Sequence, residues 1–327
     1  LNTYFAQSAK SMAQGDERYA PSSMRFALIS NIQHQPSTIN HQPLYINHTS
    51  LSPDTISKDS LINACIFNPD PLTTANITYG SPYIDSNDVD IPELNAERDS
   101  VMITVRFKND TFFLESPYCI VGEYDPPANP VCFDTTADLC YTRGDLCFEQ
   151  VNIFYHINNY QAYLQSLGFD SLVNYQIKVD ANGWSGLDNS SFSSFTNLLS
   201  FGEGGVDDGE DADVIIHEYG HAISHSAAPN TNTGIQRKTL DEANADYLAA
   251  SLSRAIDTSD WQKVFNWDGH NEFWSGRWVV SNKHYPEDWI GGIYQDADIW
   301  SATLMQIWED IGRTAADRIL LQSLYSY

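Results

Sequence analysis

The chain has 327 residues, of which 42% are apolar and 18% are charged, so a sizeable core can form and extensive disorder is not expected. Its 17 Lys and Arg residues stand against 43 Asp and Glu residues, a formal net charge of −26. This acidity argues against nucleic acid and anionic membrane surfaces as partners and favours cations such as Ca²⁺. No apolar run approaches the roughly 18–20 residues that cross a bilayer, so no membrane span is expected.

The cysteines indicate an oxidising compartment. Four of the five lie between positions 119 and 147, and no pair has the C-x-x-C spacing of a zinc ribbon or redox site. Disulfides with one thiol left over are therefore expected, the alternative being unrelated buried thiols. Asn-x-Ser/Thr triplets and few lysines also fit an exported protein. The chain begins at Leu1 without a signal-peptide pattern, so we expect a secreted protein whose signal and pro-segment have been removed.

The first half of the chain has the pattern of β structure. Residues 1–60 are polar without sustained periodicity and predict an irregular segment. Strands are expected over 101–107 and 111–115, joined by a turn at Asn109-Asp110. A broad apolar face then predicts a helix from Phe148 to Gly168. A strand over 172–179 and an edge strand or hairpin over 192–201 are expected after it.

The second half has the pattern of helices. Helices are expected over 209–226, 240–256 and 299–311. The sequence thus predicts an α+β fold with a β-rich lobe over 61–226 that ends in a helix, followed by a mainly helical lobe over 227–327.

The helix predicted over 209–226 contains His217-Glu218-Tyr219-Gly220-His221, an H-E-x-x-H sequence. The i, i+4 spacing puts both imidazoles on one face of the helix, where they can share one Zn²⁺. Zinc lowers the pKa of a bound water toward about 7, and Glu218 is placed to take its proton. The pentapeptide alone arises by chance in about one chain of this length in a hundred, so an incidental helix with two histidines remains the alternative until a third ligand is found.

The third ligand is sought downstream of His221. The metzincin pattern needs Gly and His where this chain has Ser224 and Ala227, so that class is excluded. His225 lies one turn further along the same helix, so its imidazole is expected to lie too far along the helix axis to bind the same ion. Glu242 is the better candidate, because a returning antiparallel helix brings it back and Asp246, one turn on, can hold an imidazole N–H.

An H-E-x-x-H sequence followed about twenty residues later by E-x-x-x-D resembles the gluzincin signature of thermolysin and its relatives. Over about residues 60–327 the chain further resembles the bacterial branch of the fungalysin metallopeptidases. The resemblance implies a thermolysin-like two-lobed fold with a β-rich N-terminal lobe, a central H-E-x-x-H helix and a mainly helical C-terminal lobe. Its segments are Phe201 to Ile223, Asn68 to Thr74, Tyr79-Gly80, Tyr83 to Asp90, Gly276-Arg277, Lys283 to Trp289 and Asp298 to Ser301.

The resemblance also implies a role for individual residues. It gives one catalytic zinc held by His217, His221 and Glu242, with Glu218 as the general base. Asp246 and Asp241 would each orient one imidazole. Arg277 would support the binding pocket and the substrate carbonyl, the alternative being a structural salt bridge. The edge strand that pairs with the substrate backbone would contain Asn189, Ser190 and Ser191.

Two departures from the family pattern stand out. Tyr294 occupies the position of a histidine that stabilises the oxyanion; a phenol can donate a hydrogen bond there but supplies no positive charge. His284 is a possible substitute, and a packing role for Tyr294 is the other alternative. The family pattern also continues past the helix that begins near Ala315, whereas this chain stops at Tyr327, so a truncated C-terminal lobe is expected.

Two acidic stretches are candidate calcium sites, the alternative for each being a solvated acidic turn. The first contains Asp85, Asn87, Asp88 and Asp90. The second contains Asp207, Asp208, Glu210, Asp211 and Asp213.

The sequence therefore predicts a secreted, monomeric, zinc-dependent endopeptidase that hydrolyses peptide bonds of extracellular proteins. Two alternatives remain open. A zinc aminopeptidase would need an acidic group for the free N-terminus of its substrate. A catalytically weak, zinc-stabilised binding module is disfavoured by Glu218, because structural zinc has no use for a general base.

Overall fold

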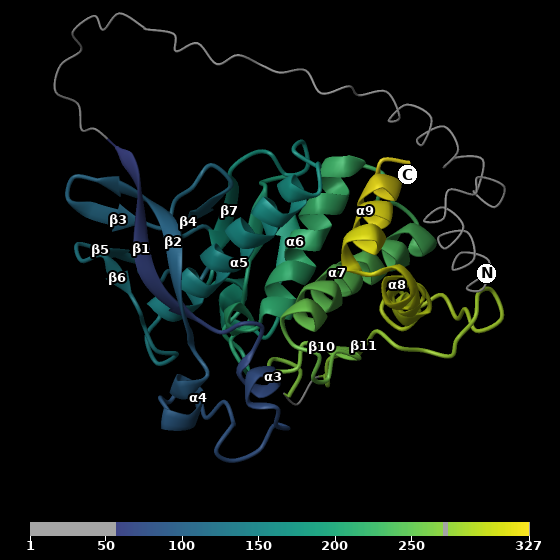
Figure 1. Cartoon of the computed structure of the whole chain (residues 1–327), viewed down its shortest axis with the longest axis horizontal. Coiled ribbons are helices and arrows are strands. Elements are labelled where there is room, and N and C mark those ends of the chain that lie inside the picture. The colour runs from purple at the N-terminus through teal and green to yellow at the C-terminus, as the bar shows by residue number, and fades with distance from the viewer. Residues whose placement is uncertain (1–56, 271–273, 327) are drawn as a thin grey trace, which may run out of the picture.

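The computed structural model describes residues 57–270 and 274–326. In this part of the chain it has seven α-helices and three sheets, which is a mixed α+β architecture. Most strands gather at one side of the molecule and the helices of the second half at the other, where a short two-stranded sheet lies beside them (Figure 1). Most of the irregular segment predicted over 1–60 lies outside the described residues. The first strand begins at Lys58, slightly before the predicted boundary.

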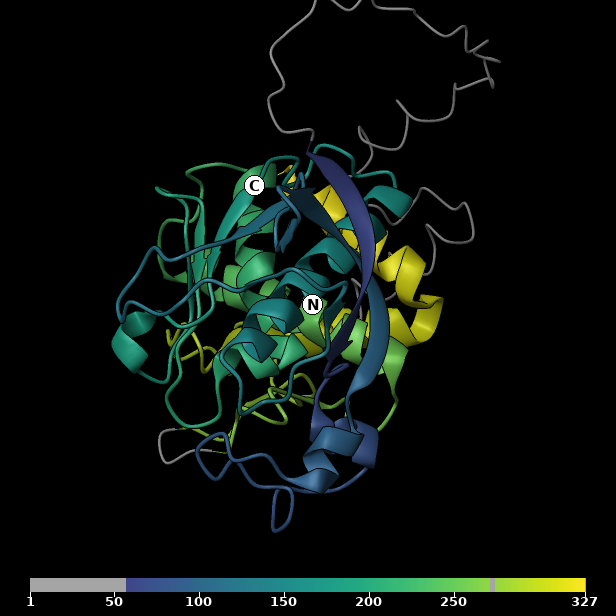
Figure 2. The ribbon, with the colours of Figure 1, turned by 90° about the vertical axis from the view of Figure 1, so that its left-hand side faces the viewer.

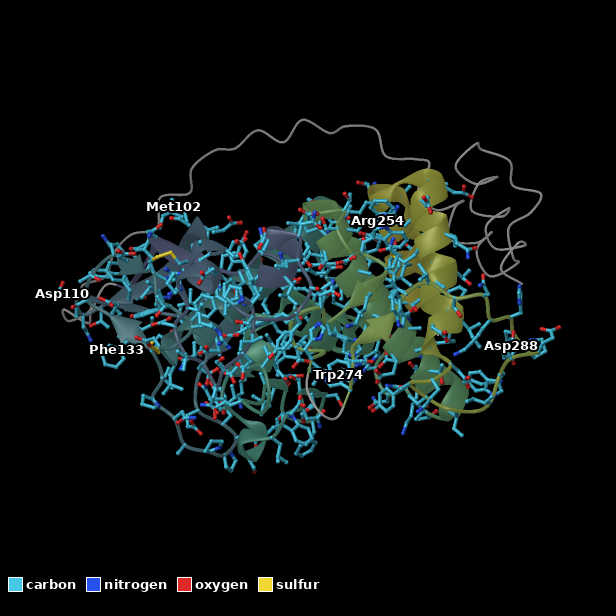
Figure 3. The ribbon with its side chains drawn as sticks, turned by 90° about the horizontal axis from the view of Figure 1, so that it is seen from below. Met102, Asp110, Phe133, Arg254, Trp274 and Asp288 are labelled. Atoms are coloured by element: carbon cyan, nitrogen blue, oxygen red, sulfur yellow. A yellow bond between two sulfur atoms is a disulfide. The ribbon has the colours of Figure 1, made fainter. Side chains whose placement is uncertain are left out.

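The five-stranded sheet has the order β5-β3-β2-β1-β6. β1 and β2 form a long antiparallel ribbon (Figure 2), and the exposed side chains of Met102 and Phe133 lie near the end of the molecule that carries this sheet (Figure 3). The predicted hairpin is confirmed: Asn109 and Asp110 have φ angles of 52° and 58° between the paired residues Lys108 and Thr111. Two consecutive positive φ angles match the twist of the strands, and Asn and Asp tolerate them. The strands are β1 (Lys58–Ile66), β2 (Asp99–Lys108), β3 (Thr111–Phe113), β5 (Phe133–Asp134) and β6 (Asp138–Leu139).

Two disulfides tie this region together. Cys65 in β1 is bonded to Cys140, which follows β6, and Cys132 is bonded to Cys147 at the start of the first long helix. Cys119 is free and buried, and burial raises the pKa of its thiol. The prediction of disulfides with one unpaired thiol is confirmed.

The four-stranded sheet has the order β4-β7-β9-β8, with only β8 antiparallel to its neighbour. The predicted hairpin over 192–201 is confirmed, and β8 is an edge strand. The strand predicted over 172–179 begins only at Ile177, because the backbone before it bonds to side chains: Leu172 accepts from Gln161 and Val173 donates to Ser226. The strands are β4 (Cys119–Val121), β7 (Ile177–Asp180), β8 (Ser191–Ser193) and β9 (Leu198–Ser200).

The long helices are packed in chain order. α5 contacts both larger sheets and α6; α6 packs on α7, and α7 packs on α8 and α9 (Figure 1). The predicted helices are confirmed, with bounds that differ by a few residues. The helices are α3 (Pro71–Ala75), α4 (Pro92–Ala96), α5 (Cys147–Ser166), α6 (Ala212–Ala227), α7 (Ile235–Ile256), α8 (Ala297–Ile311) and α9 (Arg313–Leu324). None of the helices in the described ranges is long and apolar enough to span a bilayer.

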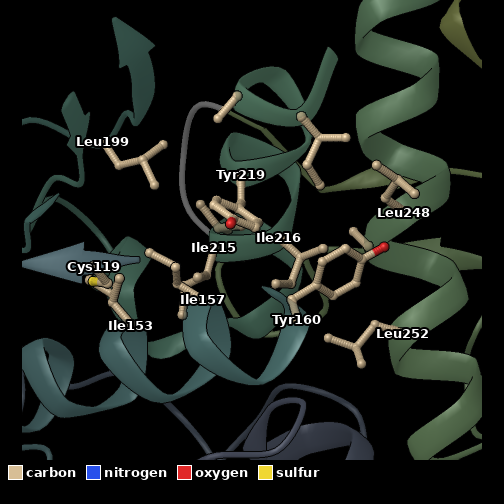
Figure 4. Packing of buried hydrophobic residues seen from close by; sticks show 14 of the residues in the cluster. Cys119, Ile153, Ile157, Tyr160, Leu199, Ile215, Ile216, Tyr219, Leu248 and Leu252 are labelled. Atoms are coloured by element: carbon tan, nitrogen blue, oxygen red, sulfur yellow. The ribbon is translucent and has the colours of Figure 1, made fainter. Parts of the chain in front are cut away.

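α6 lies in the middle of the main core. In Figure 4 its residues Ile216 and Tyr219 lie at the centre of the view, with Leu199 of β9 on one side and Tyr160 of α5 and Leu248 of α7 on the other, and all five are buried. The Tyr219 hydroxyl donates to Gln161 at 2.7 Å, so its one polar atom is satisfied. One face of α6 is thus fixed by packing, and the opposite face is left to carry polar side chains.

Gly220 sets the distance between α6 and α7. A Cβ atom at this position would lie 3.0 Å from the Cα and 3.2 Å from the Cβ of Ala245. Only a residue without a side chain allows the two helices to approach this closely. Because Gly220 lies within the H-E-x-x-H sequence, the close approach occurs beside the two histidines.

Replacement of Gly220 by valine should therefore push the helices apart. We expect Gly220→Val to lower the free energy of unfolding by about 1–3 kcal/mol, as overpacked cores do. Gly220→Ala should cost less, since alanine gains about 1 kcal/mol of helix propensity over glycine. Urea unfolding followed by tryptophan fluorescence measures both, and a valine variant as stable as the parent would show that the contact is not tight.

Candidate metal centre

His217, His221 and Glu242 converge at one point between α6 and α7. The two Nε2 atoms lie 3.2 Å apart. Glu242 Oε2 is 3.4 Å from Nε2 of His217, and Glu242 Oε1 is 3.6 Å from Nε2 of His221. These three residues form one of two groups in the described residues that are close enough to hold a metal ion. The prediction that Glu242 returns to the histidine pair on an antiparallel helix agrees with this geometry.

The spacing of the three donors fits a small divalent ion. Ligands that each lie about 2.0–2.1 Å from zinc at a tetrahedral angle are separated by about 3.3–3.4 Å. The three observed separations, 3.2, 3.4 and 3.6 Å, are close to that value. Two imidazole nitrogens and one carboxylate are also a donor set that zinc accepts, with a fourth position left for water or substrate.

The outer nitrogens of both imidazoles face carboxylates. Nδ1 of His221 is hydrogen-bonded to Asp241 Oδ2 at 2.9 Å, and Nδ1 of His217 lies 2.9 Å from Asp246 Oδ1. Such carboxylates fix the ring orientation and turn Nε2 toward the metal. Asp241 is held in turn by Asn232, whose side-chain amide donates to it at 2.8 Å. Asn232 was not predicted, because nothing in the sequence links this loop residue to the histidines.

The charges of this centre favour a bound cation. Burial alone would lower the pKa of His221, but the hydrogen bond to Asp241 and the charge of Glu242 outweigh it and raise the pKa to about 10. Burial likewise opposes the ionised form of Glu242, yet the contact with His217 and the charge of His221 hold its pKa well below the usual range. Asp241 and Glu242 thus stabilise positive charge beside the two Nε2 atoms.

Glu218 is buried beside the two histidines, with 7% of its surface exposed. Its Oε2 atom is inaccessible to solvent and has no hydrogen-bond donor in the described part of the chain. A buried carboxylate oxygen without a donor is costly. No donor from the described residues therefore competes for this oxygen atom.

Arg277 and Tyr294 border the same centre. Arg277, in the short strand β11 (Arg277–Trp278) that pairs with β10 (Lys263–Val264), donates from Nη1 to Glu242 Oε2 at 2.8 Å and to Asp246 Oδ1 at 2.9 Å. In this structure Arg277 therefore forms salt bridges, which was the alternative to a role in binding substrate. Tyr294 is 58% exposed, and its ring centroid lies 5.1 Å from the guanidinium. The charge of Glu242, followed by burial, raises the pKa of its phenol, which keeps the hydroxyl able to donate.

The two other candidate histidines lie elsewhere. The ring of His225 is 6.0 Å from that of Phe192 in β8, and His225 does not belong to either metal-capable group of the described residues. The side chain of His284 is 67% exposed and lies 3.8 Å from Asp288. Neither residue contacts the centre formed by His217, His221 and Glu242.

Of the three residues predicted to form the substrate-pairing edge strand, only Ser191 lies in β8 at the free edge of the four-stranded sheet; Asn189 and Ser190 precede the strand. Ser191 is the first residue of β8, and its hydroxyl accepts a hydrogen bond of 3.1 Å from the indole of Trp184. Ser190 donates to the carboxylate of Asp208. Asn189 lies just before them, and its backbone N–H donates to Leu187. β8 packs beside α6, so this edge runs next to the helix that carries the histidines.

The first candidate calcium stretch contacts protein groups in this structure. Instead of an open site, Arg143 binds this loop: its Nη2 lies 2.7 Å from Asp85 Oδ1 and 3.3 Å from Asp88 Oδ1, and Nη1 donates to the Asp85 carbonyl. The backbone of Asn87 donates to Asp85, and Asp90 accepts from Thr142 at 2.8 Å. The loop therefore already has a cationic partner, which is 1% exposed.

Most carboxylates of the second acidic stretch accept hydrogen bonds from other residues of the chain. Glu210 binds Arg143 and the indole of Trp267. Asp211 caps α6, accepting from the backbone of Asp213, which itself accepts from Ser253 and Phe265. Of the five acids in this stretch, only Asp208 belongs to a metal-capable group, and its companions are Asp188 and Asp268 from distant parts of the sequence. Within this stretch, calcium therefore stays a hypothesis for Asp208, whereas the carboxylates of Glu210, Asp211 and Asp213 bind protein groups.

Comparison with known proteins does not identify the chain. No protein-family model matches it, and no curated protein is significantly similar to it.

The pKa of His221 leads to a prediction for the metal-free protein. The folded chain, with a pKa near 10, keeps a proton that the unfolded chain, with a pKa near 6.5, loses. The contribution of the His221–Asp241 pair is therefore complete below about pH 6.5 and is lost as pH rises toward about 10. Thermal unfolding of the chelator-treated protein should show a steeper loss of Tm over this range than that of Asp241→Asn.

An exposed acid provides the control for this experiment. Asp110→Asn removes the same charge from a turn where asparagine is equally tolerated, and it should leave the pH profile of the parent unchanged. If Asp241→Asn also followed the parent profile, the pair would not hold a proton on His221.

Proposed function

We propose that this chain is a secreted zinc endopeptidase of the thermolysin-like, fungalysin-related class, which hydrolyses internal peptide bonds of extracellular proteins. The observation that carries the proposal is the convergence of two Nε2 atoms and one carboxylate beside a buried carboxylate oxygen that lacks a donor in the described residues. A purely structural metal site would need the first three groups but not the fourth. The two disulfides are compatible with an extracellular protein.

Each residue of the site has a distinct part in this proposal. Zinc, when held by His217, His221 and Glu242, supplies a Lewis acid that polarises the scissile carbonyl and lowers the pKa of a water molecule. Glu218 accepts the proton of the attacking water and returns it to the leaving amine. Its buried position keeps the carboxylate next to the reacting groups without a competing donor from the described residues.

Two further groups would act on the substrate. The hydroxyl of Tyr294 donates a hydrogen bond to the developing oxyanion, since its raised pKa keeps it protonated. The free edge of β8 pairs with the extended substrate backbone by β-augmentation, as its terminal place in the sheet allows. Arg277 holds Glu242 and Asp246 in place, so its role in this proposal is to position the carboxylates.

Replacement of Glu218 by glutamine tests the general base. Glu218→Gln should retain one zinc per chain, because the metal-binding groups are unchanged, and it should lose activity by about 10²–10⁴-fold. Cleavage of an N-terminally blocked casein-like substrate is measured together with the zinc content of both proteins. A parent that binds zinc but does not cleave would favour the binding module, and cleavage only of peptides with a free N-terminus would favour the aminopeptidase.

Replacement of Tyr294 by phenylalanine tests the oxyanion donor. Loss of one such donor should lower kcat by about 10²–10³-fold with little change in KM, because the bond strengthens only in the transition state. Tyr285→Phe is the matched control, since it removes a hydroxyl that accepts from Gln236. Equal activity of the two variants would leave Tyr294 a packing role only.

A further inference from the structure

We propose a calcium site formed by Asp188, Asp208 and Asp268, separate from the centre at His217, His221 and Glu242. These three acids form the second metal-capable group of the described residues, with one carboxylate oxygen of each within 4.8 Å of the others. They come from three different loops, so no local sequence pattern predicts that they lie together.

The surroundings of Asp208 indicate that a cation binds here. It lies in the short 3₁₀ turn Asp208–Glu210 before α6 and is 2% exposed. One carboxylate oxygen, Oδ2, accepts from Ser190, whereas Oδ1 is buried without a hydrogen-bond donor in the described ranges of the chain. Burial, followed by the charge of Asp208, raises the pKa of Asp268, whose carboxylate lies close to that of Asp208. A buried carboxylate that faces another acid needs a cation or a shared proton.

The first of the three loops is held in place by the glycine segment. A Cβ atom at Gly202 would lie 1.8 Å from the carbonyl oxygen of Leu187, and one at Gly204 would lie 2.4 Å from the backbone nitrogen of Asp188. The two backbones are therefore in direct contact, which only glycine permits. This contact brings the loop of Asp188 against the segment that leads to Asp208.

The third loop is fixed by the N-cap of α6. Oδ2 of Asp211 accepts from the backbone N–H groups of Trp267 and Asp268 at 3.0 and 3.1 Å. These bonds hold the backbone of Asp268 against the start of α6, and its carboxylate lies close to that of Asp208. Asp268 is 1% exposed.

The charges around Asp208 are mainly negative. Burial, followed by the charges of Asp188 and Glu218, raises the pKa of Asp208 to about 8, against the lowering effect of the bond from Ser190. Arg143 does not neutralise this charge, because its guanidinium is bound to Glu210. A divalent cation among the three carboxylates would remove the repulsion.

The donor set selects the kind of ion. Three carboxylates without nitrogen or sulfur suit a hard cation and not a second zinc. Ca²⁺ accepts several carboxylates in flexible geometry, whereas Mg²⁺ usually takes one or two and keeps most of its waters. The bound ion is therefore inferred to be Ca²⁺.

The site has a consequence for the edge strand. Ser190, which donates to Asp208, directly precedes β8, so a cation held by Asp188 and Asp208 would order the start of that strand. This consequence for substrate binding rests on the proposed peptidase function. The cation site itself does not rest on it.

Calcium binding to the full chain tests the proposal. The calcium-free protein, kept at one zinc per chain, is titrated with CaCl₂ by calorimetry, and its Tm is measured with and without Ca²⁺. The parent should bind Ca²⁺ and gain Tm, as ligand linkage requires. Asp208→Asn and Asp268→Asn should each weaken binding by at least about tenfold. Without Ca²⁺ both should be at least as stable as the parent, because a neutral amide replaces a buried carboxyl group whose ionisation is unfavourable.

Two controls make the result specific. Asp110→Asn carries the same charge change in an exposed turn and should keep the calcium affinity of the parent. Asp188→Asn, from the half-buried loop, repeats the test should either buried variant fail to fold. No calcium binding by the parent, or unchanged affinity in the three site variants, would overturn the proposal, and Mg²⁺ binding as tight as that of Ca²⁺ would overturn the choice of ion. Both readouts are independent of peptidase activity.

Discussion

The close contact of α6 with α7 at Gly220 and Ala245 is the constraint on which the candidate metal centre depends. A side chain at position 220 would push the two helices apart and move Glu242 away from the two imidazoles. The i, i+4 spacing aligns the histidines along α6 and places Glu242 and Asp246 one turn apart on α7. The helix contact turns these two local patterns into a single centre, with donor separations of 3.2 to 3.6 Å.

The start of α6 is fixed by buried acids, which is one way in which a chain with a net charge of −26 uses its carboxylates. Asp211 and Asp213 accept backbone N–H groups from the 265–268 segment and thereby tie it to the first turn of the helix. Negative charge at this end also suits the helix dipole. Glu210 forms an ion pair with the buried Arg143, which also binds Asp85 and Asp88 in their loop. A bound cation among Asp188, Asp208 and Asp268 would be a third means of neutralising buried acids.

At the metal centre, Arg277 shares Glu242 and Asp246 with the imidazoles. Its guanidinium neutralises part of the acidic cluster and holds the carboxylates in position for a metal ion. The same positive charge lies near the ring of Tyr294, where it partly offsets the effect of Glu242 on the phenol. Arg277 therefore links the acids that would bind or support a metal to the residue proposed to face the substrate.

Local patterns in the sequence were sufficient for the elements that depend on near neighbours. The hairpin at Asn109-Asp110, the helices α5 to α8 and the β8–β9 hairpin follow from periodicity and turn chemistry, which act over a few residues. The two histidines, Glu218 and the E-x-x-x-D segment were also identifiable, since helical spacing places such residues on one face. The strand expected from Leu172 failed because its backbone groups bond to side chains of α5 and α6, which no local pattern shows.

The tertiary structure alone decided which distant acids meet. It gave Asp85 and Asp88 a buried arginine where the sequence suggested calcium, and it brought Asp208 together with Asp188 and Asp268. It also added Asn232 behind Asp241 and turned Arg277 toward Glu242. Composition and spacing determined that this chain carries many acids and one helix with an H-E-x-x-H sequence. The partner of each acid depends on loop contacts between residues far apart in the sequence, such as the glycine contacts at Leu187 and Asp188, and these exist only in the folded chain.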